Sequence, residues 1–178
     1  MRQGLAPLVP LAILGLAGCS RSPDLFMPPI ERKPVTGAEP SRLRAFIVMS
    51  DPDAEIHLVG GVNRKLEAGA WRWASGRAEL QFVIPRSRSL RFVADVVAAE
   101  ATFAQTGPVT LAVSVNGRPL GALRLETPGP HRFEKPVPEG WLRAGELVRV
   151  VIEADKVYVD SRDGARLGFI LHRAGFLP

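Results

Sequence analysis

The sequence predicts an all-β domain over residues 43–178, a two-sheet antiparallel β-sandwich of about eight to nine strands. Three observations lead to this fold class. Apolar and polar residues alternate with a period of two in several segments, turn residues separate those segments, and helical periodicity is almost absent. About 135 residues are enough for one domain with its own hydrophobic core.

Four segments carry the clearest alternation, and each is expected to bury one face. They are residues 79–85, 90–97, 109–115 and 147–153. The side chains expected to point inward are Leu80, Phe82 and Ile84; Leu90, Phe92, Ala94 and Val96; Val109, Leu111, Val113 and Val115; and Val148, Val150 and Ile152.

Asn116-Gly117 is the strongest hairpin signal in the chain, because both residues tolerate a positive φ. Pro119 follows closely and has no backbone N–H to donate. The returning strand is therefore expected to start near Leu120, at a sheet edge or after a bulge.

The N-terminus has the features of a secretory signal peptide over residues 1–18. Arg2 supplies a positive charge, and residues 5–16 form an apolar stretch that is too short to span a membrane. The tetrapeptide Leu-Ala-Gly-Cys that ends at Cys19 resembles the lipobox of bacterial lipoproteins. The resemblance implies cleavage before Cys19 and lipidation of its thiol, so the single cysteine serves as a membrane anchor and forms no disulfide.

Ser20 follows the cysteine. In lipoproteins of double-membraned bacteria, Asp at this position favours retention in the inner membrane, so the resemblance implies an outer-membrane location in the cell envelope. Residues 19–42 contain five prolines and are expected to form an extended tether without helix or central strand.

Charge argues against a nucleic-acid-binding role. Removal of residues 1–18 takes away Arg2 and no acidic residue, so the net charge falls from +5 to +4. The remaining basic residues are scattered, and the densest group is Arg86, Arg88 and Arg91. A nucleic-acid-binding protein concentrates such residues on one element with aromatic residues between them.

Aromatic residues are the candidates for binding a sugar ring, with charged neighbours for its hydroxyl groups. The candidate ligand-binding residues are Trp71, Trp73 and Trp141, with Arg72, Glu67 and Asp163 as polar partners. In a strand, Trp71 and Trp73 share one face and Arg72 lies on the other. The default use of Trp is packing, and we therefore expect the pair in the core and Arg72 exposed, with exposure of the pair as the alternative.

Three stretches together resemble the galactose-binding-like jelly rolls, a fold shared by many carbohydrate-binding modules. They are Gly60-Gly61 with Glu67 and Trp71-Arg72-Trp73; the strand–turn–strand VSVNGRPLGALRL at 113–125; and the ending from Asp163 to Phe169, which contains D-x-x-R-L-G. The resemblance implies a jelly-roll sandwich, in which carbohydrate binding is common and a purely structural role is also frequent.

The ending motif has two further interpretations. Asp163 and Arg166 are expected to form an ion pair that fixes the last strand. The alternative, a calcium ion on Asp160 and Asp163, has fewer acidic residues than a full calcium loop. We expect no cofactor and no metal.

No motif for catalysis is present. The three histidines lie on different segments, and neither G-x-S-x-G nor a phosphate-binding glycine loop occurs. The sequence thus favours a non-catalytic, lipid-anchored sandwich that binds envelope or extracellular polysaccharide. The alternative is an accessory lipoprotein that docks an envelope protein, and a glycan-active enzyme is the weakest hypothesis.

Overall fold

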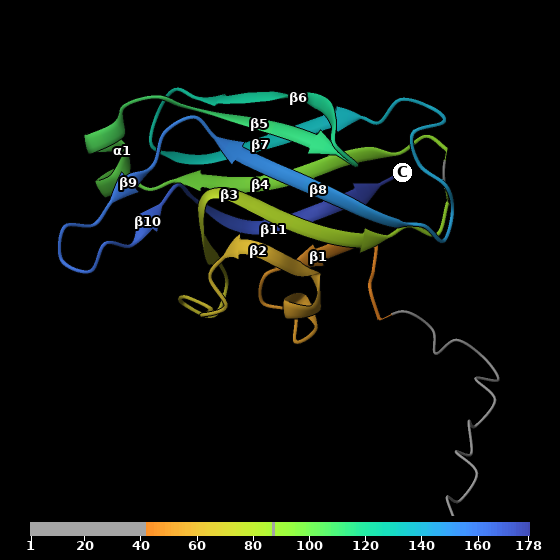
Figure 1. Ribbon diagram of the computed structural model, residues 1–178, viewed down its shortest axis with the longest axis horizontal. Helices are drawn as coiled ribbons and strands as arrows, with labels where there is room; N and C mark the ends of the chain where they lie inside the picture. The colour runs from red at the N-terminus through yellow and green to blue at the C-terminus, as the bar shows by residue number, and fades with distance from the viewer. Residues whose placement is uncertain (1–41, 87) are drawn as a thin grey trace, which may run out of the picture. The chain divides into compact units, whose positions relative to one another are not determined.

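Antiparallel strands make up just over half of the residues that the structure describes, as the computed structural model in Figure 1 shows. The structure describes residues 42–86 and 88–178, all of which belong to one compact unit. The predicted signal peptide, Cys19 and residues 19–41 of the tether lie outside the described residues. The strands are β1 (Phe46–Val48), β2 (Leu58–Val62), β3 (Arg72–Val83), β4 (Arg91–Ala98), β5 (Val109–Val115), β6 (Arg118–Leu125), β7 (Gly129–Pro136), β8 (Leu147–Ala154), β9 (Tyr158–Val159), β10 (Arg166–Leu167) and β11 (Phe169–Leu177).

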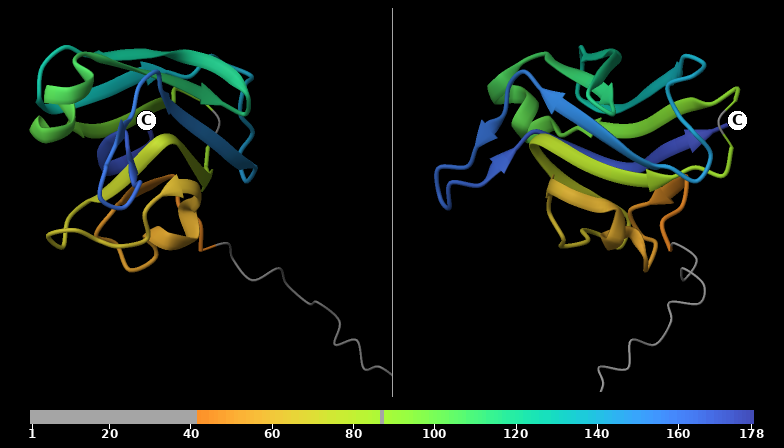
Figure 2. Two further views of the ribbon diagram at one scale, coloured as in Figure 1. Left: turned by 60° about the vertical axis from the view of Figure 1, so that its left-hand side comes forward. Right: turned by 45° about the vertical axis from the view of Figure 1, so that its right-hand side comes forward.

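Nine strands form one antiparallel sheet that folds over into two layers. The order is β6-β5-β8-β3-β11-β4-β7, with β1 paired to β11 and β2 paired to β3. β3 joins the layers, because its residues 77–83 pair with β8 and its residues 72–74 pair with β11. Figure 2 shows β5 and β6 on the side opposite β1 and β2. The predicted antiparallel sandwich is confirmed.

The core lies between the layers, and the inward faces are the predicted ones. Every residue predicted to point inward from the four alternating segments is buried. Four phenylalanines from different strands meet at the centre, with ring centroids 5.3 to 6.4 Å apart; they are Phe82, Phe92, Phe133 and Phe176. Edge-to-face and tilted pairs of this kind stabilise a core beyond the area that they bury.

The predicted hairpin is also confirmed. Asn116 and Gly117 have φ of 48° and 75°, and they connect β5 to β6. The returning strand begins at Arg118, earlier than the expected Leu120, and Pro119 sits beside a register shift on this edge strand. Its missing N–H therefore costs little, as expected for Pro at an edge.

Two short helices were not predicted. The 3-10 helix η1 (Ala54–His57) precedes β2, and α1 (Glu100–Thr106) connects β4 to β5. α1 spans less than two full turns and ends at Gly107, whose φ is 64°. Such a short helix leaves almost no periodic signal in the sequence. In the described residues, no helix has the length and hydropathy required to cross a membrane.

Candidate functional site

Two tryptophans lie on the outer face of the sandwich where β3 begins, Trp73 within the strand and Trp71 just before it. Trp71 and Trp73 are partly exposed, and their rings meet edge to face with centroids 5.7 Å apart. Arg72 points to the other side and is 5% exposed. The expectation of a core tryptophan pair with an exposed Arg72 is therefore wrong.

The reason is the alternation of β3 itself. Phe82, Leu80, Ala78 and Ala74 are fully buried, and the same parity leads back to Arg72. Extending the inward face of the 79–85 segment by eight residues would have placed Arg72 inside and Trp73 outside.

The guanidinium of Arg72 contacts other parts of the protein. Its Nε donates to the carbonyl oxygen of Met49 (3.4 Å), Nη1 donates to the carbonyl oxygen of Arg64, and Nη1 lies 3.7 Å from Glu55 Oε1. These contacts tie η1 and the loops after β1 and β2 to β3, so Arg72 supports the fold and is not available to a ligand.

Trp73 lines a concavity of about 300 Å³, which we call the Trp73 pocket. Its other walls come from β2, the loop after it, β3 and the β9–β10 hairpin, and include Asn63, Ser75, Arg166 and Leu167. Arg166 is exposed, and no hydrogen bond or ion pair engages its guanidinium in the described part of the chain. The Trp73 indole, a free guanidinium and small polar groups thus line one concavity.

Gly61 shapes this pocket. It has a φ of 68°, and a Cβ there would lie 1.6 Å from the carbonyl oxygen of Arg77. The register of β2 against β3 shifts on both sides of Gly60. The close approach of β2 to β3 therefore requires glycine at this position.

Glu67 and Asp163 do not line the pocket and are engaged locally. Glu67 forms a β-bridge with Trp71, and its carboxylate lies 2.9 Å from Lys65 Nζ. Asp163 accepts a hydrogen bond from the backbone N–H of Ala165 (2.9 Å). The predicted ion pair between Asp163 and Arg166 is not formed.

Asp160 forms an ion pair within the turn between β9 and β10. Its carboxylate pairs with Arg162 (2.7 Å), which lowers the pKa of Asp160 to about 2. Across residues 42–86 and 88–178, His, Cys, Asp and Glu nowhere gather in a group of three suited to a metal ion. The described residues therefore contain no such cluster for the alternative calcium ion on Asp160 and Asp163.

Trp141 lies at the opposite end of β3. It belongs to the loop between β7 and β8, and that loop contacts the end of β3 through the Gly145 N–H and the Ile84 carbonyl (2.9 Å). The guanidinium of Arg118 lies 5.6 Å from the centre of its ring. The three predicted tryptophans therefore do not form one site.

A larger concavity, about 560 Å³, lies on the outer face of β1, β11, β4 and β7, and sequence reasoning missed it. We call it the outer trough. Val48, Arg173, Asp95 and Arg132 are direct partners in a row across these four strands, and all four line it. Val97 and Pro130 form the neighbouring row and add apolar surface.

A β-bulge brings Arg173 into this row. The register of β11 against β4 shifts between Leu171 and Arg173, which leaves His172 as the extra residue. Leu171 points into the core, so without the bulge Arg173 would also point inward. No pattern in a single strand reveals this change.

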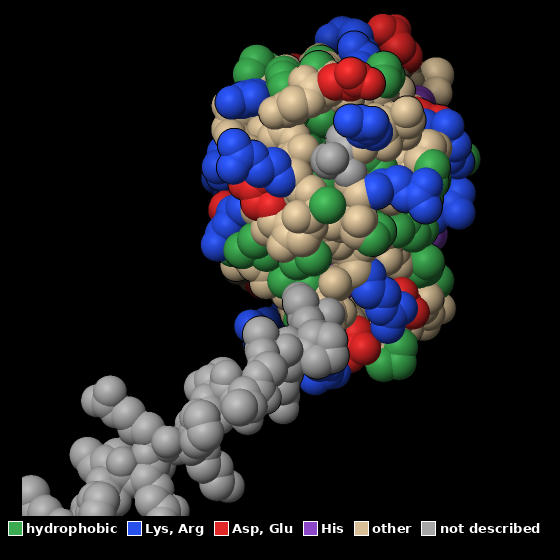
Figure 3. All heavy atoms as spheres, turned by 90° about the vertical axis from the view of Figure 1, so that its right-hand side faces the viewer, with side chains coloured by type: hydrophobic (Ala, Val, Ile, Leu, Met, Phe, Trp, Pro, Cys, Tyr) green, Lys and Arg blue, Asp and Glu red, His purple; other side chains and the backbone are tan. Residues whose placement is uncertain are grey.

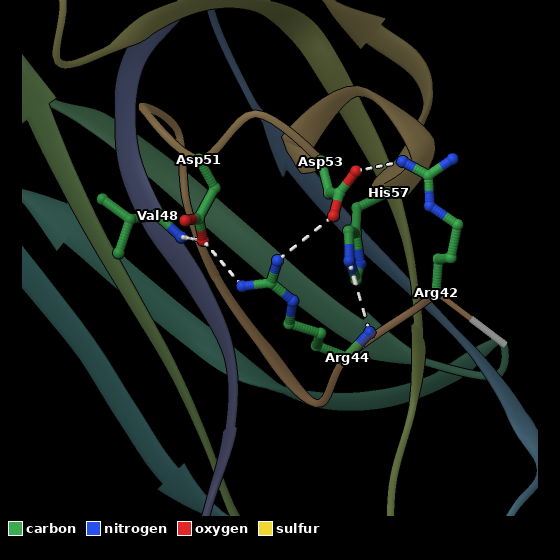
Figure 4. A network of polar contacts seen from close by, with 6 residues as sticks. All are labelled: Arg42, Arg44, Val48, Asp51, Asp53 and His57. Atoms are coloured by element: carbon green, nitrogen blue, oxygen red, sulfur yellow. Dashed lines mark hydrogen bonds and ion pairs between the residues drawn. The ribbon is translucent and has the colours of Figure 1, made fainter. Parts of the chain in front are cut away.

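A separate polar network holds the N-terminal loop of the domain (Figure 4). Asp53 pairs with Arg42 and Arg44, and Arg44 also pairs with Asp51 (3.5 Å). His57 is fully buried: Nε2 accepts from the Arg44 N–H (3.3 Å), and Nδ1 lies 2.7 Å from the Gln81 carbonyl. Burial lowers the pKa of His57, and the two arginines lower the pKa of Asp53.

Basic residues are spread over the surface rather than gathered on one element. Figure 3 shows Lys and Arg side chains around one end of the sandwich, with acidic side chains between them. Arg91, from the densest predicted group, pairs with Glu134 (3.0 Å).

Several solved structures of carbohydrate-binding proteins are similar to this chain. A family 35 carbohydrate-binding module from Clostridium thermocellum matches with a TM-score of 0.47 and 12% identity, over 70% of this chain and 93% of the module. A module from a Cellvibrio mixtus lichenase, in complex with cellotriose, matches with a TM-score of 0.37 and 16% identity, over 76% of this chain and 98% of the module.

An exo-β-1,3-galactanase from Phanerochaete chrysosporium matches with a TM-score of 0.45 and 13% identity, over 76% of this chain and 29% of the enzyme. No protein-family model and no curated protein matches the sequence. Because these TM-scores lie below 0.5, we base the function on the side chains of this chain alone.

Proposed function

We propose that this protein binds carbohydrate through the Trp73 pocket and is not itself a catalyst. The observation that carries the proposal is the partly exposed Trp73 indole beside the free guanidinium of Arg166 in one concavity. An aromatic face packs against the apolar C–H face of a pyranose, and convergent polar groups bond its hydroxyls.

The remaining surface supports this proposal over protein docking. The large apolar side chains exposed in the described residues are Val48, Val59, Leu147 and Val159. They are single residues on four different strands, whereas a protein-binding face usually presents a contiguous apolar patch of several hundred Å².

The test is a titration of the full chain with polysaccharide from its host's envelope, followed by tryptophan fluorescence. We expect saturable binding that Trp73→Ala weakens roughly tenfold or more, because an aromatic anchor is lost. Trp141→Ala is the matched control and should bind normally. Normal binding by Trp73→Ala together with loss in Trp141→Ala would contradict the proposal.

We also propose that lipid on Cys19 anchors the protein to the bacterial cell envelope, at the outer membrane. The support is the order of charge, apolar stretch and lipobox within residues 1–19. Cys19→Ser should abolish acyl labelling and leave unprocessed precursor. Acyl labelling that persists in this variant would overturn the anchor.

A further inference from the structure

The two arginines of the outer trough, Arg132 and Arg173, are each bonded to a carboxylate through Nε. Arg173 uses Nε to donate to Asp95 Oδ2 (2.5 Å), and Arg132 uses Nε to donate to Glu134 Oε2 (2.9 Å). In the described part of the chain, the terminal Nη1 and Nη2 groups of both residues have no acceptor. Both side chains are also substantially exposed, at 42% and 46%.

Asp95 keeps the two guanidiniums on either side of one carboxylate. Its Oδ2 bonds to Arg173, and its Oδ1 lies 3.8 Å from Arg132 Nε. That Oδ1 is buried and accepts no hydrogen bond from the described residues. The two arginines thus face two carboxylates, Asp95 and Glu134, and both contacts use Nε.

Free Nη pairs are the part of arginine that matches an anion best. They form a planar fork that bonds both oxygens of a carboxylate or phosphate group, and such charge-assisted hydrogen bonds are short and strong. Anchoring at Nε fixes the side chain in advance, which reduces the entropy lost on binding.

The outer trough and the Trp73 pocket share one face of the sheet. Trp73 pairs with Ile170, and Ile170 pairs with Val97 in the trough. Two strand spacings separate Trp73 from Val97, about 10 Å. Val97 and Pro130 continue this row within the trough and supply apolar surface on which a sugar ring can lie.

We infer that the outer trough binds the anionic group, carboxylate or phosphate, of an acidic glycan whose neighbouring residue occupies the Trp73 pocket. This inference rests on the proposed function, because it adds that the carbohydrate bound in the Trp73 pocket is anionic. Arg132 and Arg173 bond the anion, and Asp95 keeps them in place.

Matched pairs of polymers test the inference, with the full chain and isothermal titration calorimetry. Polygalacturonate is compared with its methyl ester, and phosphomannan with dephosphorylated mannan. We expect one acidic polymer to bind about tenfold more tightly than its neutral partner. The pair that shows this preference identifies carboxylate or phosphate as the bound group.

Arg132→Gln and Arg173→Gln should each remove the preference for the acidic polymer. Arg124→Gln is the control, because Arg124 also bonds a glutamate two residues ahead through Nε (Glu126, 3.0 Å) but lies on β6. It should keep the preference.

The outcomes separate the two proposals. Equal binding of acidic and neutral polymers, lost in Trp73→Ala, would overturn the inference and leave the proposed function standing. A preference for the acidic polymer that survives Arg132→Gln and Arg173→Gln would also overturn it. Absence of binding to all four polymers would count against both.

Discussion

Arginine is used in opposite ways on the two sides of the layer that contains β3 and β11. On the inner side, Arg72 is buried and its Nε and Nη1 are engaged by backbone carbonyls and Glu55. On the outer side, Arg132 and Arg173 are anchored only through Nε. The comparison shows what separates a structural arginine from one that is available to a ligand: whether the guanidinium is buried against the protein or leaves its Nη groups exposed.

Removal of the buried arginine should give the largest effect. Arg72→Met leaves the carbonyls of Met49 and Arg64 without a donor, and we expect the free energy of unfolding to fall by about 3 kcal/mol. Arg132→Met on the outer side should change it by no more than about 0.5 kcal/mol. Urea denaturation measures both, and similar losses in the two variants would abolish the distinction.

The Trp73 pocket can be disturbed without altering an arginine. Gly61→Ala places a Cβ against the Arg77 carbonyl at a positive φ, and we expect a loss of roughly 2 kcal/mol in stability. Gly60→Ala is the matched control, because a Cβ there meets nothing within 4 Å. Thermal unfolding compares the two, and equal melting temperatures would show that β2 does not need its close approach to β3.

The smallest effect should come from pH and the N-terminal loop. His57 is buried in its neutral form, and burial lowers its pKa. The unfolded state therefore binds a proton near pH 6.5, whereas the folded state does not. Stability should therefore fall as the pH drops below about 6.5, down to the folded-state pKa. The carboxyls of Asp53 and Asp160 act only at lower pH, below their ordinary value of 3.8.

His57→Gln provides the control for this pH dependence. Chemical denaturation at pH 7.5 and pH 5.5 should give a lower free energy of unfolding at pH 5.5 for the natural chain, and a smaller difference for the variant. An unchanged difference in His57→Gln would assign the pH dependence to other groups.

The candidate site was predictable only in part. Trp73 was named from its chemistry, and Arg166 was assigned to an ion pair that does not form. The default of a packed tryptophan predicts an exposed Arg72, whereas the parity of Leu80 and Phe82 in the same strand predicts the buried Arg72 that is found. The position of Trp141 depends on how a long loop returns to β3, which no local pattern specifies.

The sequence by itself determined the features that depend on near neighbours. Alternation within a strand indicates which face is buried, because side-chain direction is a local property. Asn116-Gly117 indicates a hairpin, because turn geometry is also local. The outer trough was decided only by tertiary structure. Its row joins Val48, Asp95, Arg132 and Arg173 from four strands, and the bulge at His172 sets which side chain enters it. Register between distant strands is a property of the folded sheet, and the sequence of one strand does not contain it.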